Sequence, residues 1–311
     1  MKDGCKLCPR ACGVDRAAGE LGFCGMGSVA RVARASLHPF EEPSISGTRG
    51  SGTVFFAGCS LGCVYCQNAA IRTPESGTPL EDGALAALFL AVQAAGAHNL
   101  NLVTATHFAD RVASALALAR PALRIPVVYN CGGYECVEAL RLLEGLVDVY
   151  LPDFKYVSSS LAAACSAAPD YVQHARAALG EMFRQVGAVR FDGEGMMQSG
   201  VMVRHLVLPG YRADSMAVLD AIAETLPVQE IRLSLMRQYT PEFAGERAPR
   251  SLHRRVTSFE YEAVMAHAEA LGFEGYYQGK ESATAAFTPD FAERELLADF
   301  LHNSAREEKH S

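Results

Sequence analysis

The sequence predicts an α/β protein built as a partial (β/α)6 TIM-like barrel with a short N-terminal cysteine-rich extension. From residue 53 onward, short apolar, β-branched stretches alternate with longer helical ones, as in βαβ units with a parallel sheet. Six such pairs favour a barrel over an open doubly wound sheet. The chain has 311 residues, half of them hydrophobic, which suits one barrel of roughly 200–250 residues plus a small extension.

Each expected strand is a short apolar run, as in parallel strands that are buried on both faces. The expected strands are Thr53–Ala57, Asn101–Ala105, Pro126–Tyr129, Val147–Leu151, Val201–Leu208 and Glu230–Leu235. One helix is expected after each strand. These helices are Leu80–Ala95, Arg111–Ala119, Cys136–Leu146, Ser160–Val186, Ala213–Thr225 and Phe259–Leu271. An amphipathic helix with a charged tail is expected over Pro289–Glu308.

The chain is expected to divide into four parts. Residues 1–30 are rich in cysteine and lack apolar periodicity, so a metal would have to organise them. Residues 31–52 are expected to form a linker, 53–288 the barrel, and 289–311 the C-terminal helix and tail. The glycine-rich end of the linker does not follow a clear strand and open a helix, so we expect a turn there and not a phosphate loop.

Composition and charge exclude several classes of partner. The net charge is −7 and no block of Lys and Arg stands out, which argues against nucleic acid. No apolar run approaches the ~20 residues of a membrane helix, and the polar start of the chain has no apolar signal region. We therefore expect a cytoplasmic protein. In that reducing compartment, closely spaced cysteines more often bind metal than form disulfides.

Three cysteines directly follow the first strand, in the run Cys59-Ser-Leu-Gly-Cys63-Val-Tyr-Cys66. Chemistry in parallel α/β folds lies at such strand ends. Three thiolates would hold a [4Fe–4S] cluster whose fourth iron has no protein ligand. S-adenosylmethionine (SAM) could chelate that iron, and one electron would then release a 5′-deoxyadenosyl radical that abstracts hydrogen. The alternative is three structural cysteines or a zinc site, which would need a fourth ligand.

Five stretches carry a family resemblance: Glu41–Gly47, Gly58–Asn68, Tyr150–Tyr156, Val203–Gly210 and Leu233–Pro241. Through them, roughly residues 36–287 resemble the radical SAM superfamily and, within it, the pyruvate formate-lyase activating enzyme-like group, in an uncharacterised branch of activating-enzyme homologues. The resemblance implies an oxidoreductase with a [4Fe–4S] cluster and SAM, and a reductant such as flavodoxin or ferredoxin.

The resemblance also implies candidate SAM contacts at two of the strand ends. Thr104 and Thr106 end the second strand, where radical SAM proteins have a stretch that receives the SAM ammonium. Asn130 stands where activating enzymes have an aspartate. An amide there accepts a hydrogen bond but brings no charge.

Two further strand ends bring charge to the same expected site. Asp153 and Lys155 project from one face of their strand end, which suits the zwitterionic methionine part of SAM. Arg204 could form a fork with the SAM carboxylate, while His205 would point to the opposite face. The alternative is that Asp153, Lys155 and Arg204 form an ion-pair network that closes the barrel.

The N-terminal segment has a cysteine set of its own, Cys5, Cys8, Cys12 and Cys24. Four thiolates satisfy a closed zinc site and equally a second [4Fe–4S] cluster. Zinc would make a clamp or docking platform, whereas a cluster could relay electrons or bind substrate. We lean to iron–sulfur, because the protein must already receive iron at its other site.

Three functions follow from these sites. The first is glycyl-radical enzyme activation, in which hydrogen is abstracted from a glycine of a partner protein. The second is radical SAM chemistry on a small molecule or another protein target. The third is a non-catalytic iron–sulfur or zinc protein for electron transfer, which four ligands on the central cluster would favour; the sequence offers three.

Overall fold

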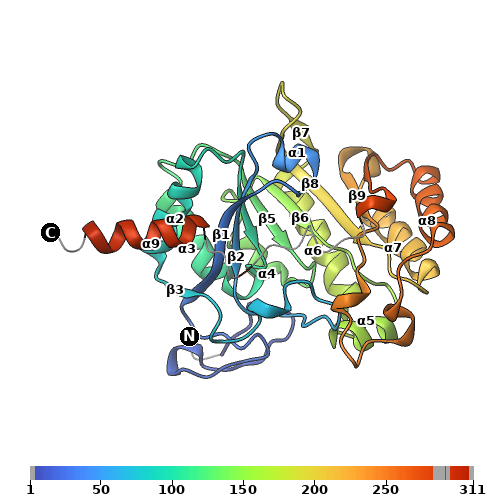
Figure 1. Cartoon of the computed structure of the whole chain (residues 1–311), viewed down its shortest axis with the longest axis horizontal. Helices are drawn as coiled ribbons and strands as arrows, with labels where there is room; N and C mark the ends of the chain where they lie inside the picture. Colours follow the sequence, from blue (N-terminus) through green and yellow to red (C-terminus); the bar gives the residue numbers. More distant parts are fainter. Residues whose placement is uncertain (1–3, 283–290, 292–294, 308–311) are drawn as a thin grey trace.

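The computed structural model describes residues 4–282, 291 and 295–307. At its centre the described strands form one mixed sheet with the order β10-β9-β8-β6-β5-β4-β2-β1-β3, and β7 pairs with β8 (Figure 1). The strands are β1 (Ala30–His38), β2 (Ser51–Phe56), β3 (Thr78–Leu80), β4 (Leu100–Val103), β5 (Val127–Cys131), β6 (Val149–Pro152), β7 (Arg190–Phe191), β8 (Met197–Leu206), β9 (Arg232–Met236) and β10 (Gly275–Tyr277).

Helices flank this sheet on its outer side (Figure 1). They are α2 (Asp82–Ala94), α3 (Ala109–Ala119), α4 (Val137–Arg141), α5 (Ser159–Ser166), α6 (Tyr171–Val186), α7 (Arg212–Thr225), α8 (Ser258–Ala270) and α9 (Glu295–Glu307), while the short α1 (Pro43–Ser46) lies at one end of the sheet. Within the described part of the chain, none of the helices has the length and apolar character needed to cross a membrane.

The predicted fold class is confirmed. The six expected strands appear in order as β2, β4, β5, β6, β8 and β9, paired in parallel, and β10 adds a further parallel strand. The path through the sheet begins at β10 and ends at β3, so the described strands form a partial, open barrel.

Much of the segment 31–52, expected to be a linker, is instead built into the fold as β1, α1 and the start of β2. Strand β1 pairs antiparallel with β2, from Val32 opposite Phe56 to His38 opposite Ser51. It is buried over most of its length, and α9 packs against it. Because it contains Arg31 and Arg34, its sequence does not show the apolar pattern of a buried strand. The division of the chain into domains stays a prediction.

The single helix expected over Ser160–Val186 is two helices. Helix α5 ends at Ala167, whose φ of 50° is left-handed, and Pro169 follows before α6 begins. The residue before a proline avoids the helical region, so the break has a local cause. Helix α9 matches the expected last helix over Glu295–Glu307, and the expected ends at Pro289 and Glu308 lie outside the described residues.

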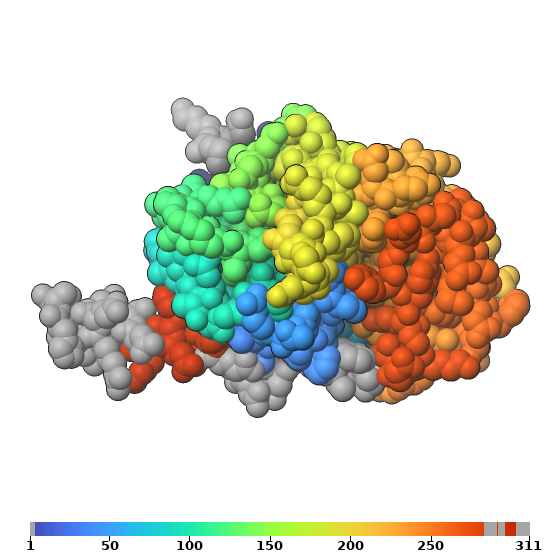
Figure 2. Space-filling model, turned by 90° about the horizontal axis from the view of Figure 1, so that it is seen from above, coloured from blue at the N-terminus to red at the C-terminus, as the bar shows by residue number. Residues whose placement is uncertain are grey.

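Helix α1 closes the amino-terminal end of the barrel. Its Ile45 is fully buried against residues on the inner faces of β5, β6 and β8, among them Val128, Val149 and Met202. Figure 2 looks onto this end and shows the blue segment around α1 filling the space beside the yellow β7–β8 region. Because apolar side chains fill this end, the polar interior lies towards the carboxyl ends of the strands.

Candidate active site

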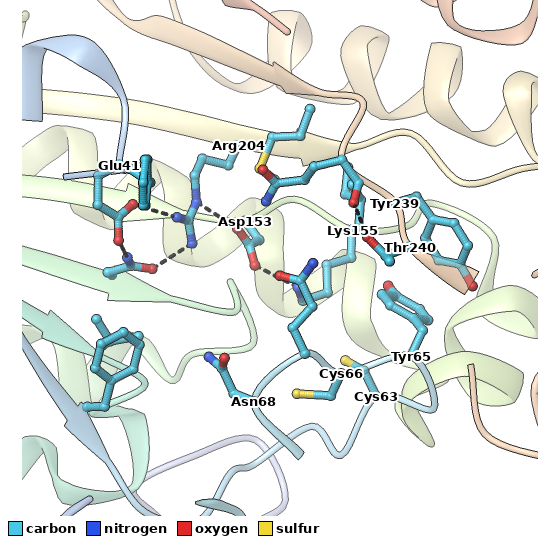
Figure 3. A pocket seen from close by; sticks show the side chains of 18 of the residues that line it. Glu41, Cys63, Tyr65, Cys66, Asn68, Asp153, Lys155, Arg204, Tyr239 and Thr240 are labelled. Carbon is cyan, nitrogen blue, oxygen red and sulfur yellow. Dashed lines mark hydrogen bonds and ion pairs between the residues drawn. The ribbon is translucent and has the colours of Figure 1, made fainter. Parts of the chain in front are cut away.

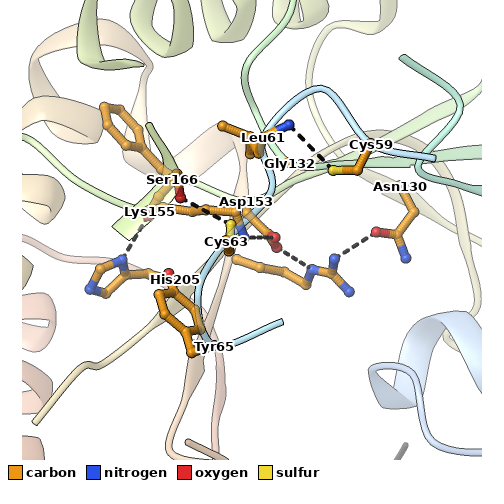
Figure 4. Close-up of polar contacts among 12 residues, drawn as sticks. Cys59, Leu61, Cys63, Tyr65, Asn130, Gly132, Asp153, Lys155, Ser166 and His205 are labelled. Atoms are coloured by element: carbon orange, nitrogen blue, oxygen red, sulfur yellow. Dashed lines mark hydrogen bonds and ion pairs between the residues drawn. The ribbon is translucent and has the colours of Figure 1, made fainter. Parts of the chain in front are cut away.

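The loop with three cysteines leaves the sheet directly after β2. It begins at Gly58, whose φ of +83° favours glycine. Cys63 and Cys66 line a cavity inside the barrel. Cys59 lies beside them and accepts a hydrogen bond from the Leu61 N–H, at 3.4 Å (Figure 4). The loop therefore holds three thiols at the mouth that the strand ends define.

The other two sulfurs also have hydrogen-bond partners. The Ser166 hydroxyl lies 3.0 Å from the Cys63 sulfur (Figure 4), and the backbone N–H of Asn68 donates to Cys66. Burial raises the pKa of the Cys63 thiol and that of Cys66 to about 12. These thiols are therefore protonated at neutral pH, and iron would have to displace their protons on binding.

This donor set fits a cluster with one open iron. Among the described residues, no group of three or more His, Cys, Asp or Glu side chains is arranged to hold a single metal ion. In a cubane each cysteine binds a different iron, so its ligands need not converge on one point. The three thiols still influence one another, because Cys63 and Cys59 both raise the pKa of Cys66.

A cavity of about 220 Å³ adjoins the cysteine loop (Figure 3). Apart from the cysteines, its polar lining comes from β1 and the segment after it, the cysteine loop, and the carboxyl ends of the strands. These side chains are His38, Glu41, Tyr65, Gln67, Asn68, Asn130, Asp153, Lys155, Arg204, Gln238, Tyr239 and Thr240. Four of the six predicted SAM contacts (Asn130, Asp153, Lys155 and Arg204) are thus brought together beside Cys63 and Cys66.

Asp153 and Lys155 form a charged pair on the cavity wall. The Lys155 Nζ lies 2.6 Å from the Asp153 carboxylate, and both side chains are less than one-fifth exposed. Burial opposes the charge on Asp153, but Arg204 and Lys155 outweigh it and lower its pKa. Burial likewise opposes the charge on Lys155, and Asp153 outweighs it and raises the Lys155 pKa. A permanent ammonium and carboxylate therefore face the cavity together.

Arg204 is held by three acceptors of the protein itself. Its guanidinium donates to Asp153 at 2.9 Å, to the Asn130 side-chain oxygen at 2.6 Å and to Glu41 at 3.2 Å. This is the ion-pair network named above as the alternative, and the role of Arg204 in binding a SAM carboxylate stays a prediction. His205 is turned away, as the strand alternation predicts, with its Nδ1 2.7 Å from the Phe154 carbonyl oxygen.

Glu41 lines the cavity although it was not among the predicted site residues. Its carboxylate accepts from Asn101 at 3.4 Å and from Asn130 at 3.3 Å. Burial raises its pKa, against the opposing effect of Arg204. The available signal was a pair of acidic residues just before Pro43, which opens α1. If these two carboxylates were buried, they would need a cationic partner, and Arg204 is that partner for Glu41.

The structure does not bring Thr104 or Thr106 to the cavity lining. The Thr106 hydroxyl donates to the buried Glu135 carboxylate at 2.6 Å. Thr104 has a left-handed φ of 62°, and its N–H donates to the Asn130 carbonyl oxygen. Strand β4 ends at Val103, and a short 3-10 helix (Thr106–Phe108) begins after two intervening residues.

The four N-terminal cysteines lie near one another. Cys8 is within electrostatic reach of Cys24 and Cys5, and Cys24 is within reach of Cys5 and Cys12. The segment that carries them runs below the sheet in Figure 1, at the end where the parallel strands finish. A second cysteine group therefore lies on the same side of the molecule as the first.

Comparison with known proteins gives distant similarities. No family model matches the chain. A Methanocaldococcus jannaschii protein named "Uncharacterized protein MJ0674" is 28% identical over 281 residues, which are 88% of this chain and 76% of that protein.

Among solved structures, the chain resembles HemN of Escherichia coli, coproporphyrinogen III oxidase, described as a radical SAM enzyme. The TM-score is 0.48 at 11% identity, over 70% of this chain and 51% of HemN. Streptococcus suis SuiB gives TM-scores of 0.48 bound to precursor peptide SuiA, at 11% identity over 73% of this chain and 48% of SuiB, and 0.45 bound to SAM, at 10% identity over 73% and 50%. The chain thus spans about half the length of these proteins, and its site has to be judged by its own residues.

Proposed function

We propose that this chain is a radical SAM enzyme in which Cys59, Cys63 and Cys66 bind a [4Fe–4S] cluster. The observation that supports this most directly is that Cys63 and Cys66 line the same cavity as the charged pair Asp153 and Lys155. When bound, the cluster would pass one electron to SAM, which splits into methionine and a 5′-deoxyadenosyl radical that takes a hydrogen atom from a substrate.

The residues of the chain would bind and orient SAM. The Lys155 ammonium has three N–H donors and suits the methionine carboxylate. Asp153 suits the methionine ammonium, since Arg204 and Lys155 keep it ionised. Arg204 would position both Asp153 and Asn130, because it donates to both. Because Arg204 and Lys155 both hold Asp153 in place, SAM would enter a site that is already oriented.

SAM cleavage is the direct test. The full chain is reconstituted anaerobically with iron and sulfide, reduced with dithionite and assayed for 5′-deoxyadenosine. We expect product from the parent and none from Cys63→Ala. Cys136→Ala, which changes a half-buried cysteine that does not line the cavity, should retain activity within about twofold. If the fully loaded, reduced parent forms no 5′-deoxyadenosine, the proposal fails.

A second variant tests the SAM site separately from the cluster. Lys155→Met should raise the KM for SAM about tenfold or more, since a charge-assisted hydrogen bond contributes about 1.5–3 kcal/mol. The visible absorption of the cluster should not change. Lys280→Met, at an exposed lysine, is the matched control. An unchanged KM in Lys155→Met would remove Lys155 from the SAM site.

The finer proposal is that the hydrogen atom comes from a glycine of a polypeptide. Phe40 supports it, because it lines the cavity while 54% of the residue is exposed, as expected of an apolar docking point at the entrance. The probe is a mixture of heptapeptides with dideuterated glycine. Deuterium in the 5′-deoxyadenosine would support a polypeptide substrate, and SAM cleavage with no transfer from any peptide would favour a small molecule.

A further inference from the structure

The N-terminal segment, residues 4–28, has almost no hydrophobic core. Only Cys8 and Met26 are buried within it, and its one regular element is a 3-10 turn over Arg16–Ala18. Even so, the segment has defined turns, such as the hydrogen bonds from the Cys5 N–H to the Val14 oxygen and from the Gly13 N–H to the Cys5 oxygen. Chain segments with so little apolar burial usually owe their order to a disulfide or a metal.

Two of its cysteines lie in turns whose backbone N–H groups donate to sulfur, although burial still raises the pKa of both thiols. The backbone N–H of Arg10 donates to the Cys8 sulfur, and that of Met26 donates to the Cys24 sulfur. In both cases the donor lies two residues after the cysteine. Hydrogen bonds to sulfur favour the charged form, which is the form that binds metal. All four cysteines are free thiols, so no disulfide orders the segment.

Arg10 fastens this segment to the loop of Cys59, Cys63 and Cys66. It stands between Cys8 and Cys12, and its guanidinium donates to the carbonyl oxygens of Ser60 at 2.8 Å and Leu61 at 3.3 Å. It also donates to the Ser166 carbonyl oxygen at 2.9 Å. The guanidinium lies 3.8 Å from the centre of the Phe23 ring, which comes from the same N-terminal segment. One side chain therefore joins the segment, the cysteine loop and the end of α5.

The two cysteine groups also meet through their backbones. A Cβ atom placed on Gly58 would lie 2.8 Å from the Cys24 carbonyl oxygen and 2.5 Å from the Met26 side chain. Only glycine permits so close an approach. Gly58 precedes Cys59 and Cys24 belongs to the N-terminal group, so a shift of either chain segment would be felt by the other.

We propose that Cys5, Cys8, Cys12 and Cys24 bind a metal centre, either zinc or a second iron–sulfur cluster, which fixes Arg10 and thereby holds the loop of Cys59, Cys63 and Cys66 in place. Soft thiolate ligands select these two kinds of centre. For a single zinc ion the sulfurs would have to draw together, since no three described ligands are arranged for one ion. The catalytic meaning of the loop rests on the proposed function, but metal binding by the four cysteines does not.

Metal content tests the site. In the full chain, Cys59, Cys63 and Cys66 are all replaced by alanine, and the protein is purified anaerobically, once with zinc and once after treatment with iron and sulfide. We expect this triple variant to retain about one zinc or about four irons with matching sulfide per chain. Adding Cys8→Ala and Cys24→Ala should remove that metal. A triple variant with neither metal in stoichiometric amount would overturn the site, whether or not the parent cleaves SAM.

Hydrogen–deuterium exchange tests the connection to the loop. Arg10→Ala, and separately Cys8→Ala with Cys24→Ala, should each speed amide exchange in residues 59–66 at least tenfold. Exchange in β9 and α8 should stay unchanged, which shows that the variants are folded. Lys6→Ala, at an exposed position between two of the cysteines, is the control and should leave the loop protected. Unchanged exchange in the loop of the double cysteine variant would overturn the connection.

Discussion

The hydroxyl of Ser166 contacts the cysteine loop directly, at the sulfur of Cys63. It lies 3.0 Å from the Cys63 sulfur and 3.0 Å from the Tyr156 hydroxyl, and Tyr156 in turn bonds the Tyr65 hydroxyl. Ser166 is buried, so water cannot easily replace it. Hydrogen bonds to the sulfur ligands are one of the main influences on the potential of an iron–sulfur cluster.

Replacing Ser166 with alanine should lower the reduction potential of the [4Fe–4S] cluster proposed for Cys59, Cys63 and Cys66. Reduction adds negative charge, so a donor to sulfur stabilises the reduced state more than the oxidised one. A hydrogen bond of about 1.5–3 kcal/mol corresponds to roughly 60–130 mV for one electron, and part of it should be lost. A redox titration followed by electron paramagnetic resonance measures the shift. Ser160→Ala, on the same helix, is the control, and equal potentials for parent and Ser166→Ala would contradict the prediction.

Glu135 is a buried acidic residue between β5 and α4. Burial raises its pKa to about 7, although Thr106 and Tyr129 donate to it. Because this lies above the ordinary value of 4.5, the folded protein holds the proton more tightly than the unfolded chain. The contribution of Glu135 to stability is therefore fully present below pH 4.5 and is lost as the pH rises through about 7.

Glu135→Gln removes this titration and keeps a side chain of the same shape. The difference in free energy of unfolding, variant minus parent, should be about 1 kcal/mol larger at pH 8 than at pH 6. Anaerobic urea unfolding followed by circular dichroism measures the difference at each pH, with the metal content of the two proteins matched. A difference that stays constant with pH would show that Glu135 is not the titrating group.

At this scale the sequence predicts what lies along one strand and misses what packing brings from far away. Asp153 and Lys155 were placed on one face by alternation, and both line the cavity. Glu41 meets Arg204 across 163 positions of sequence, and Ser166 meets Cys63 across 103. No spacing rule reaches such distances. Thr106 does not line the cavity, because its hydroxyl is directed at the buried Glu135 carboxylate.

Among the elements, the junction between α5 and α6 has a measurable strain. Ala167 ends α5 in the left-handed region, with its N–H directed at the carbonyl oxygens of Ala162 and Ala163, and its side chain is exposed. Glycine adopts this conformation without steric cost. Ala167→Gly should therefore stabilise the protein by about 0.5–1 kcal/mol.

The matched control for this junction is Ala163→Gly, at an exposed position inside the same helix. Glycine there should destabilise the protein by about 1 kcal/mol. The midpoints of urea unfolding compare the two variants with the parent. If both substitutions shifted the midpoint in the same direction, the strain assigned to Ala167 would be absent.

Element prediction succeeded where burial was uniform. The six parallel strands are largely buried on both faces, because helices cover one side and the barrel interior lies on the other. Strands β3, β7 and β10 have only two or three residues, too few for a periodic pattern. Strand β1 is long, but its sequence mixes arginines with buried alanine and valine, so its place in the sheet depends on the pairing with β2 and on α9.

For the molecule as a whole, the two ends of the barrel have different chemistry. Ile45 and its neighbours close the amino-terminal end with apolar packing, while both cysteine groups lie at the carboxyl end. Strand β1 connects the two ends, because it runs antiparallel to β2 and carries the chain from the N-terminal cysteines to Glu41. The strand order in the sequence locates the end that carries the candidate site, whereas the closed end depends on α1, which was not predicted.

The position of Arg10 has a consequence for the order of events during synthesis. The four N-terminal cysteines are complete once residue 24 has left the ribosome, and their turns are local. The partners of Arg10 follow much later: Leu61 is 51 positions further on and Ser166 is 156. If the four cysteines bind the metal proposed for them, the segment can acquire it on a nascent chain that has no barrel, whereas the loop of Cys63 is held only after α5 has been made. In a cell short of metal, we therefore expect newly made protein to lack order first in its N-terminal segment. That segment is far in sequence from the cavity whose function would be lost.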